Sequence, residues 1–141
     1  MEQITLFRGD FAFLSNFQKC QVEFEGDVYP TVEHAFQAAK TFDKEERQKI
    51  LSTASPVMAK RIGRRVCLRD DWEDVKCDIM LELLKSKFSD SELKEKLLAT
   101  GDAELIEGNN HGDRFWGQVN GEGKNTLGLL LMKVREGLQS E

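Results

Sequence analysis

Helix start signals recur along this chain and constrain its fold more than any other feature. Residues that cap helices stand directly before most of the amphipathic segments, and twice a glutamate follows three residues later to complete a capping-box pattern. Thr31, Ser55 and Asn125 are the expected N-caps outside those two boxes, and Gly101 stands where a helix would end. The predicted helices run over residues 31–40, 43–52, 55–65, 70–88, 90–100 and 125–138.

Short strands are expected between these helices. Residues 4–7 and 103–107 are strand candidates, and a turn at Gly26-Asp27 between residues 20–25 and 28–29 predicts a small hairpin. The aromatic segment 11–17 and the Gly- and Asn-rich segment 109–124 are expected to be loops. The prediction is an α+β, mostly helical single domain over residues 1–141, with a few short strands.

The composition of the chain indicates its cellular environment and the kinds of partner it can have. A chain of 141 residues is the size of one domain, and no apolar run approaches the roughly 20 residues of a membrane span, so we expect no membrane partner. The N-terminus lacks a signal-peptide pattern, and Cys20, Cys67 and Cys77 are odd in number, which favours reduced thiols in a cytoplasmic protein. The net charge of −5 disfavours general coating of DNA and favours a small anionic ligand or a short nucleic-acid feature.

The helix predicted over residues 31–40 carries the first candidate site. Glu33, Gln37 and Lys40 stand at i, i+4 and i+7 and share one face, beside a strongly apolar surface. If burial lowers the pKa of Lys40, its neutral amine can act as a nucleophile, with Glu33 as a hydrogen-bond acceptor or base. A solvent-facing stripe explains the same spacing, and the spacing does not decide between the two.

The loop of residues 110–117 carries the second candidate site. It combines a carboxylate, a histidine, an arginine and two aromatic side chains with glycines that permit close approach of a ligand. Asp113 is a candidate general acid or base, and Trp116 is a candidate for stacking on a base or ring. We favour function over a sealing role at the core edge, because so long an ordered loop is uncommon without one.

Other motifs are weaker. Residues 121–126 fit neither a P-loop nor a dinucleotide fingerprint, although the helix that begins at Asn125 offers N–H groups to an anion. His34 and His111 stand apart from any metal-ligand spacing, so we predict no metal site and expect His34 to be a structural hydrogen-bonder. A basic cluster is expected to be solvated, with a phosphate contact from one member as the alternative; it comprises Lys60, Arg61, Arg64, Arg65 and Arg69.

Taken in order, the motifs of this chain resemble those of the NADAR family (NAD- and ADP-ribose-associated, also called YbiA-like). The resemblance covers nearly the whole chain, and only the order of its motifs makes it specific. Ala35 departs from the pattern, since the family commonly has an aromatic residue after the histidine. The motifs are Phe13-Leu14-Ser15-Asn16-Phe17, the segment 30–40, Gly63-Arg64, Arg69-Asp70-Asp71-Trp72, Asp113, Trp116-Gly117 and Asn125-Thr126-Leu127-Gly128.

This resemblance implies N-glycosidase activity, which is hydrolysis of the bond between a ribose-type sugar and a base, with no cofactor. One associated substrate class is ADP-ribose on guanine in nucleic acid or nucleotides, which we favour; the other is a phosphorylated ribosylamino-pyrimidine intermediate of riboflavin biosynthesis. The expected partner is thus a small ADP-ribose-type or ribosyl-phosphate substrate, or ADP-ribosylated DNA or RNA. A non-catalytic module that binds NAD or ADP-ribose, and a helical interaction protein, are the alternatives.

The resemblance also suggests roles for residues. Lys40 would attack the anomeric carbon and form a Schiff base, Glu33 would orient the substrate or stabilise the cation, and Asp113 would shuttle protons. Phe17 and Trp116 would stack on the substrate. The full set of expected substrate-binding residues is Phe13, Ser15, Asn16, Phe17, Gln37, Arg64, Arg69, Trp72, Trp116, Gly117 and Asn125.

Overall fold

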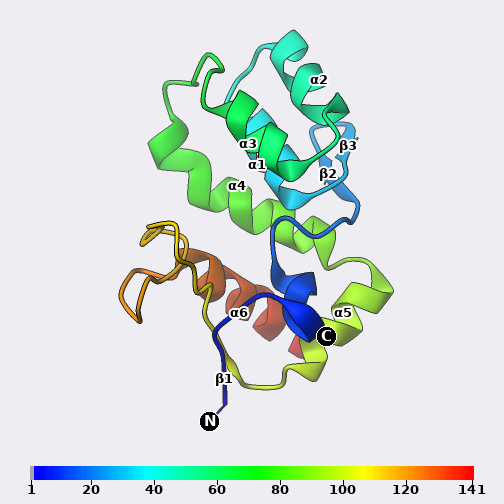
Figure 1. The fold of residues 1–141 in the computed structure, drawn as a ribbon. Helices are drawn as coiled ribbons and strands as arrows, with labels where there is room; N and C mark the ends of the chain where they lie inside the picture. Colours follow the sequence, from blue (N-terminus) through cyan, green and yellow to red (C-terminus); the bar gives the residue numbers. More distant parts are fainter. Residues whose placement is uncertain (1) are drawn as a thin grey trace. The chain divides into compact units, whose positions relative to one another are not determined.

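The computed structural model describes residues 2–141 and confirms an α+β chain that is mostly helical (Figure 1). The chain divides into two compact units, each described here by itself. One unit comprises residues 16–87, and the other comprises the residues up to 15 together with residues 88–141.

Helix α1 (Val32–Ala39) is the centre of the unit formed by residues 16–87. Every residue of α1 is buried, and the helix packs against α2, α3, α4 and strand β2. The surrounding elements are β2 (Val22–Phe24), β3 (Asp27–Tyr29), α2 (Lys44–Ser52), α3 (Pro56–Gly63) and α4 (Trp72–Lys87).

The predicted N-caps of this unit are confirmed. The hydroxyl of Thr31 accepts a hydrogen bond from the His34 N–H at 3.0 Å, and the hydroxyl of Ser55 accepts one from the Met58 N–H at 3.2 Å. Asp43 caps α2 by accepting from two backbone N–H groups. These bonds satisfy donors that the first turn of a helix leaves unpaired, so each helix begins where its cap predicts.

Some boundaries and bonds differ from the prediction. The hairpin is confirmed, but its turn lies at Glu25-Gly26, one residue earlier, because these two residues adopt the positive φ angles of 49° and 91° that a tight hairpin turn requires. Helix α3 ends at Gly63, two residues before the predicted end. The capping box of α2 is not closed, because the Glu46 carboxylate accepts from the Thr41 hydroxyl and the Cys67 N–H instead.

The second predicted capping box, at residues 70–73, also differs from the prediction. Helix α4 begins at Trp72, and the carboxylate of the preceding Asp71 binds the Arg69 side chain. Ile79, Met80 and Leu83 lie in the core as their helical spacing predicts.

The other unit joins both ends of the chain through a short parallel ladder. Strand β1 (Gln3–Ile4) pairs with β4 (Glu104–Leu105), so each predicted strand is confirmed but is shorter than expected. The predicted aromatic loop contains a 3₁₀ helix, η1 (Gly9–Leu14), which buries Phe13 and Leu14 in the core. The predicted helix after Asp90 is α5 (Ser91–Ala99), and Gly101 follows it with φ = 63°.

Asn125 precedes helix α6 (Thr126–Gln139) as predicted, but its side chain does not cap it. The Asn125 amide oxygen accepts from the Glu107 N–H, and its nitrogen donates to the Leu105 carbonyl, each at 2.9 Å. The first N–H groups of α6 donate to carbonyls of residues 115 and 116. The N–H groups of Thr126 and Leu127 are therefore not available to an anion, contrary to the prediction.

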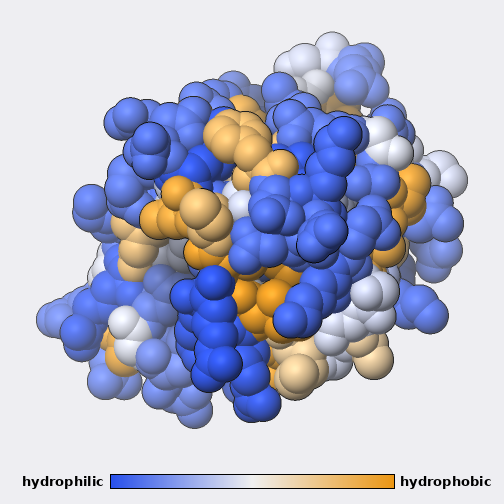
Figure 2. Space-filling view, turned by 90° about the horizontal axis from the view of Figure 1, so that it is seen from above, coloured by the Kyte–Doolittle hydropathy of each residue, from blue (hydrophilic) through white to orange (hydrophobic). Residues whose placement is uncertain are grey.

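The surface is mostly hydrophilic on the face drawn in Figure 2, with hydrophobic side chains visible between charged ones. Phe42, Val28 and Leu129 are among the exposed hydrophobic residues. None of the helices within residues 2–141 combines the length and the apolar character that crossing a membrane requires.

Candidate functional site

The polar face of α1 is buried rather than solvent-facing. Glu33 is 8% exposed and Gln37 is 4% exposed. The Gln37 side-chain N–H donates to the Glu33 carboxylate at 2.6 Å, one helical turn away. A charge-assisted bond of this length holds the carboxylate in one orientation, so Gln37 positions Glu33.

Gly63 of α3 packs directly against this glutamine. A Cβ added at Gly63 would lie 2.7 Å from Gln37 Cδ and 2.9 Å from Gln37 Cβ, and it would also overlap the amide oxygen. Only glycine permits this approach of α3 to α1. The same amide oxygen is buried against Gly63 and has no hydrogen-bond partner in residues 2–141.

Lys40 follows α1 as its C-cap and is half-buried. Burial lowers the pKa of the Lys40 amine below its ordinary value, Glu33 acts in the opposite direction, and Arg64 and Lys60 lower the pKa further. Across residues 2–141 the amine has no hydrogen-bond or ion-pair partner. This arrangement favours the neutral, nucleophilic form of the amine more than the environment of a solvent-exposed lysine would.

Arg69 is occupied by contacts within its own unit. Its guanidinium donates to both carboxylate oxygens of Asp71, at 2.6 and 3.0 Å, and to the Ala39 carbonyl at 3.4 Å. It also lies over the Phe42 ring, 4.2 Å from the centroid. The hydrogen bond to Arg69 holds the pKa of Asp71 below its usual range. Since the Arg69 N–H also donates to the Lys40 carbonyl at 2.7 Å, Arg69 secures the end of α1.

Three other predicted residues of this unit occupy different environments. Trp72 is buried and packs on Phe36, with ring centroids 4.9 Å apart, so it belongs to the core. Asn16 accepts the Glu33 N–H on its backbone carbonyl at 3.1 Å, and its buried side-chain oxygen has no partner in residues 2–141. Phe17 is 42% exposed, as a stacking surface must be.

The Asp113 loop lies in the other unit and is ordered by its own side chains. One carboxylate oxygen of Asp113 accepts from the N–H groups of Phe115 and Trp116, at 3.1 and 2.9 Å. Asn109, which sequence reasoning missed, donates to the Asp113 carbonyl and accepts from its N–H. Asn is a common residue in such turns, but this signal could not be distinguished among the many Asn and Gly residues of the loop.

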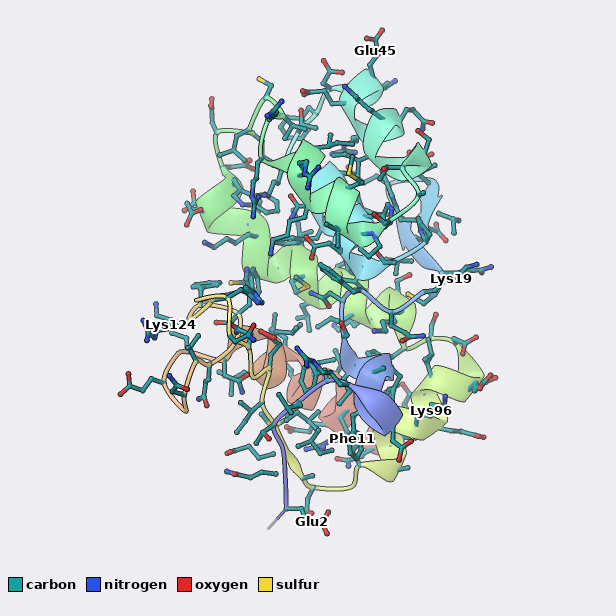
Figure 3. All side chains as sticks on the ribbon, in the orientation of Figure 1. Glu2, Phe11, Lys19, Glu45, Lys96 and Lys124 are labelled. Atoms are coloured by element: carbon teal, nitrogen blue, oxygen red, sulfur yellow. The ribbon has the colours of Figure 1, made fainter. Side chains whose placement is uncertain are left out.

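Aromatic and glycine residues support this loop. Trp116 and Phe115 pack edge to face with centroids 4.8 Å apart, and Lys124, labelled in Figure 3, lies over the Phe115 ring at 5.5 Å. A Cβ at Gly117 would overlap the Glu107 backbone, so Gly117 allows close packing of the chain. In the same unit Phe13 is buried and Ser15 is half-buried at the end of η1.

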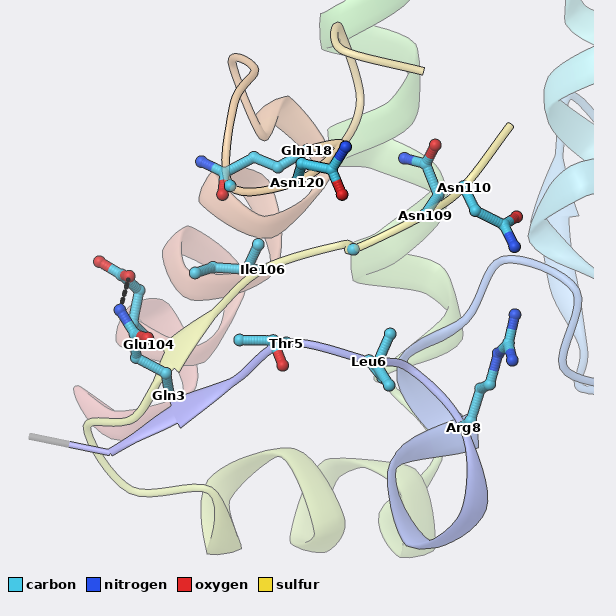
Figure 4. A pocket seen from close by; sticks show the side chains of 12 residues that line it. Gln3, Thr5, Leu6, Arg8, Glu104, Ile106, Asn109, Asn110, Gln118 and Asn120 are labelled. Carbon is cyan, nitrogen blue, oxygen red and sulfur yellow. Dashed lines mark hydrogen bonds between the residues drawn. The ribbon is translucent and has the colours of Figure 1, made fainter. Parts of the chain in front are cut away.

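A pocket of about 620 Å³ also lies in this unit, beside the β1–β4 ladder (Figure 4). Amide side chains and Arg8 form much of its lining, and Gln3 at one end is bonded to Glu104 at 2.8 Å. Asn110, the first residue of the predicted 110–117 loop, lines this pocket, but the residues to which we assigned catalytic or binding roles do not. Asn109, another lining residue, donates to the Asp113 carbonyl.

The structure thus brings Glu33, Gln37, Lys40 and Arg64 together in one unit and places Asp113 and Trp116 on one loop of the other. Residues 2–141 contain no group of three or more His, Cys, Asp or Glu residues arranged to hold a metal ion. His34 is a structural hydrogen-bonder as predicted, because its ring contacts the Thr31 hydroxyl at 2.7 Å and the Thr53 carbonyl at 3.1 Å.

Comparison with known proteins gives one family. The NADAR domain matches residues 6–139. N-glycosidase YbiA of Shigella flexneri is 43% identical over 136 residues, which cover 94% of this chain and 84% of that protein. A riboflavin biosynthesis protein of Vibrio vulnificus is 40% identical over 131 residues, 90% of this chain but 35% of that protein. The NMR structure of the E. coli protein YbiA superposes with a TM-score of 0.84 at 39% identity, over 99% of this chain and 88% of that one.

Proposed function

This chain belongs to the NADAR family and is an N-glycosidase, and we propose that it removes ADP-ribose from ADP-ribosylated guanine in nucleic acid or nucleotides. The observation that carries the proposal is Lys40, an amine whose pKa burial lowers and whose neighbour Glu33 is a buried carboxylate. Such a pair suits a reaction that builds positive charge on a sugar carbon.

In the proposed reaction, the Lys40 amine attacks the anomeric carbon and forms a C–N bond. The bond to the base breaks, and the base leaves with the electron pair and takes up a proton. A proton passes from the nitrogen of this adduct to the ring oxygen, the bond between that oxygen and the anomeric carbon breaks, and the open-chain sugar remains on Lys40 as a protonated Schiff base. Water then adds to the imine carbon, releases the sugar as an aldehyde and restores Lys40.

The other residues act on charge and protons in this scheme. Glu33, held by Gln37, stabilises the positive charge on the sugar. One Asp113 oxygen is occupied by two backbone N–H groups, which leaves the second oxygen for proton transfer. The buried side-chain oxygen of Asn16 has no partner in residues 2–141, and it suits a hydrogen bond donated by a ribose hydroxyl.

A phosphorylated ribosylamino-pyrimidine is the second candidate substrate. The observation that favours it is the relative named as a riboflavin biosynthesis protein, which matches 90% of this chain. The bond to be broken and the role of Lys40 are the same for both substrates.

Two measurements test the proposal. Mass spectrometry of the products from ADP-ribosylated guanosine and from the phosphorylated ribosylamino-pyrimidine should show free guanosine and ADP-ribose from the first. Cleavage of only the pyrimidine substrate would select the second candidate, and binding of ADP-ribose with no turnover of either would select a non-catalytic module.

Covalent chemistry is tested separately. Borohydride reduces a Schiff base to a stable secondary amine, so treatment during turnover should leave a sugar adduct on Lys40. Lys40→Ala should lose both the adduct and the activity, whereas Lys44→Ala, which changes an exposed lysine at the start of α2, should keep both. An active Lys40→Ala enzyme would contradict the covalent mechanism.

A further inference from the structure

Lys60 of α3 and Arg64, the residue that follows α3, lie beside the contact between α3 and α1. Lys60 stands three residues before Gly63 and lies on the same side of α3, and Arg64 follows Gly63 as the C-cap of the helix. Gly63 is the residue that packs against Gln37, which fixes this face toward α1. Lys60 and Arg64 therefore flank the place where α3 meets the Glu33–Gln37–Lys40 face.

The electrostatics agree with this placement. Both Lys60 and Arg64 act on the Lys40 amine and lower its pKa, as nearby positive charges must. Within residues 2–141 neither side chain forms a hydrogen bond or an ion pair, and Arg64 is exposed while Lys60 is half-buried. Lys60 and Arg64 thus act on Lys40 electrostatically, together with the Glu33 carboxylate, while their own side chains form no ion pair within residues 2–141.

We propose that Lys60 and Arg64 form a subsite for a phosphate on the sugar of the substrate, next to Lys40. A phosphate carries up to two negative charges and accepts hydrogen bonds from both kinds of side chain. The proposal deepens the proposed function, because the ribose carries a phosphate in both candidate substrates. The subsite makes the enzyme selective for phosphorylated ribosides over plain nucleosides.

Arg69 is not part of this subsite. Its guanidinium already binds Asp71 and the Ala39 carbonyl, and it stacks on Phe42. A phosphate would have to displace these contacts. Arg69 is a positioning residue that holds the end of α1. Lys60, which the resemblance did not single out, is the ligand-binding cation instead of Arg69.

Calorimetric titration with two non-reducing probes tests the subsite without catalysis. Methyl ribofuranoside 5-phosphate and methyl ribofuranoside cannot form a Schiff base, so they report binding alone. The wild type should bind the phosphorylated probe at least tenfold more tightly. Lys60→Gln and Arg64→Gln should each weaken that probe by about tenfold, which corresponds to about 1.4 kcal/mol, and should leave the plain probe unchanged.

Arg61→Gln is the matched control, since Arg61 is an exposed cation of the same helix outside the face that contains Gly63. It should retain the binding of both probes. Equal affinity of the wild type for the two probes, or the same loss in Arg61→Gln as in Lys60→Gln, would overturn the subsite. If the wild type binds the phosphorylated probe more tightly but turns over neither substrate, the subsite is supported and the proposed reaction is rejected. The two failures are therefore distinguishable.

Discussion

Replacement of Gly63 by alanine tests the contact that fixes α3 against α1. The new Cβ would lie 2.7 Å from Gln37 Cδ and 2.9 Å from Gln37 Cβ, and real Cβ atoms essentially never approach so closely. Either the helices separate, which costs about 1–3 kcal/mol, or Gln37 swings away and loses its bond to the Glu33 carboxylate, which costs about 1.5–3 kcal/mol. Alanine returns up to about 1 kcal/mol in helix propensity, so we expect a net loss of about 1–2 kcal/mol.

Thermal unfolding followed by circular dichroism measures this loss. A change of about 1–2 kcal/mol in a chain of this size lowers Tm by about 4–8 °C. Gly137→Ala is the control, because Gly137 lies in α6 with nothing within 4 Å of an added Cβ. That variant should gain up to about 1 kcal/mol from helix propensity alone.

A double-mutant cycle locates the cause. In a Gln37→Ala background the contacts with Cδ and the amide oxygen disappear, so Gly63→Ala should cost at least about 0.5 kcal/mol less than it costs in the wild type. The same cost in both backgrounds, or a Gly63→Ala protein as stable as the wild type, would refute the packing argument.

Three further outcomes follow from buried polar groups. Because the neutral Lys40 amine is the reactive form and its pKa is lowered, kcat/KM should rise with pH to a midpoint below 10.5, and Lys60→Gln should move that midpoint upward. Burial lowers the pKa of Lys87 to about 8 from 10.5, so the unfolded state binds more protons than the folded state between these pH values. The free energy of unfolding, measured with urea, should therefore rise by about 3 kcal/mol as the pH increases across this window. Lys87→Met should lack the rise. Asn125→Ala should lower the free energy of unfolding by about 3 kcal/mol, and Asn125→Gly by less, because glycine tolerates φ = 54°.

Helix starts could be predicted because their causes are local. The hydroxyl of Thr31 and the carboxylate of Asp43 cap N–H groups two or three residues away, so the sequence window contains both partners. Asn125 shows the limit of this reasoning. It stands where a cap should, but its amide binds the backbone of residues 105 and 107, about 20 positions away, and only the tertiary fold brings these groups together.

In the candidate site, too, a contact within one helix could be predicted from the sequence and a contact between helices could not. The bond between Glu33 and Gln37 spans one helical turn and was predictable from spacing. The contact between Gln37 and Gly63 joins two helices, and no pattern within either helix reveals it. Lys60 could be assigned to the site only after that contact showed which face of α3 points toward α1.

The cations near Lys40 have two separate effects, one on the position of Lys40 and one on the protonation of its amine. Lys40 stands at the carboxyl end of α1, where the helix dipole favours a protonated amine, as does Glu33. The Arg69 guanidinium donates to the Ala39 carbonyl at that end and places positive charge there, and the backbone N–H of Arg69 donates to the Lys40 carbonyl. Burial, Lys60 and Arg64 then act in the direction of the neutral amine. A change at Arg69 therefore alters where Lys40 lies, whereas a change at Lys60 alters the charge that Lys40 carries.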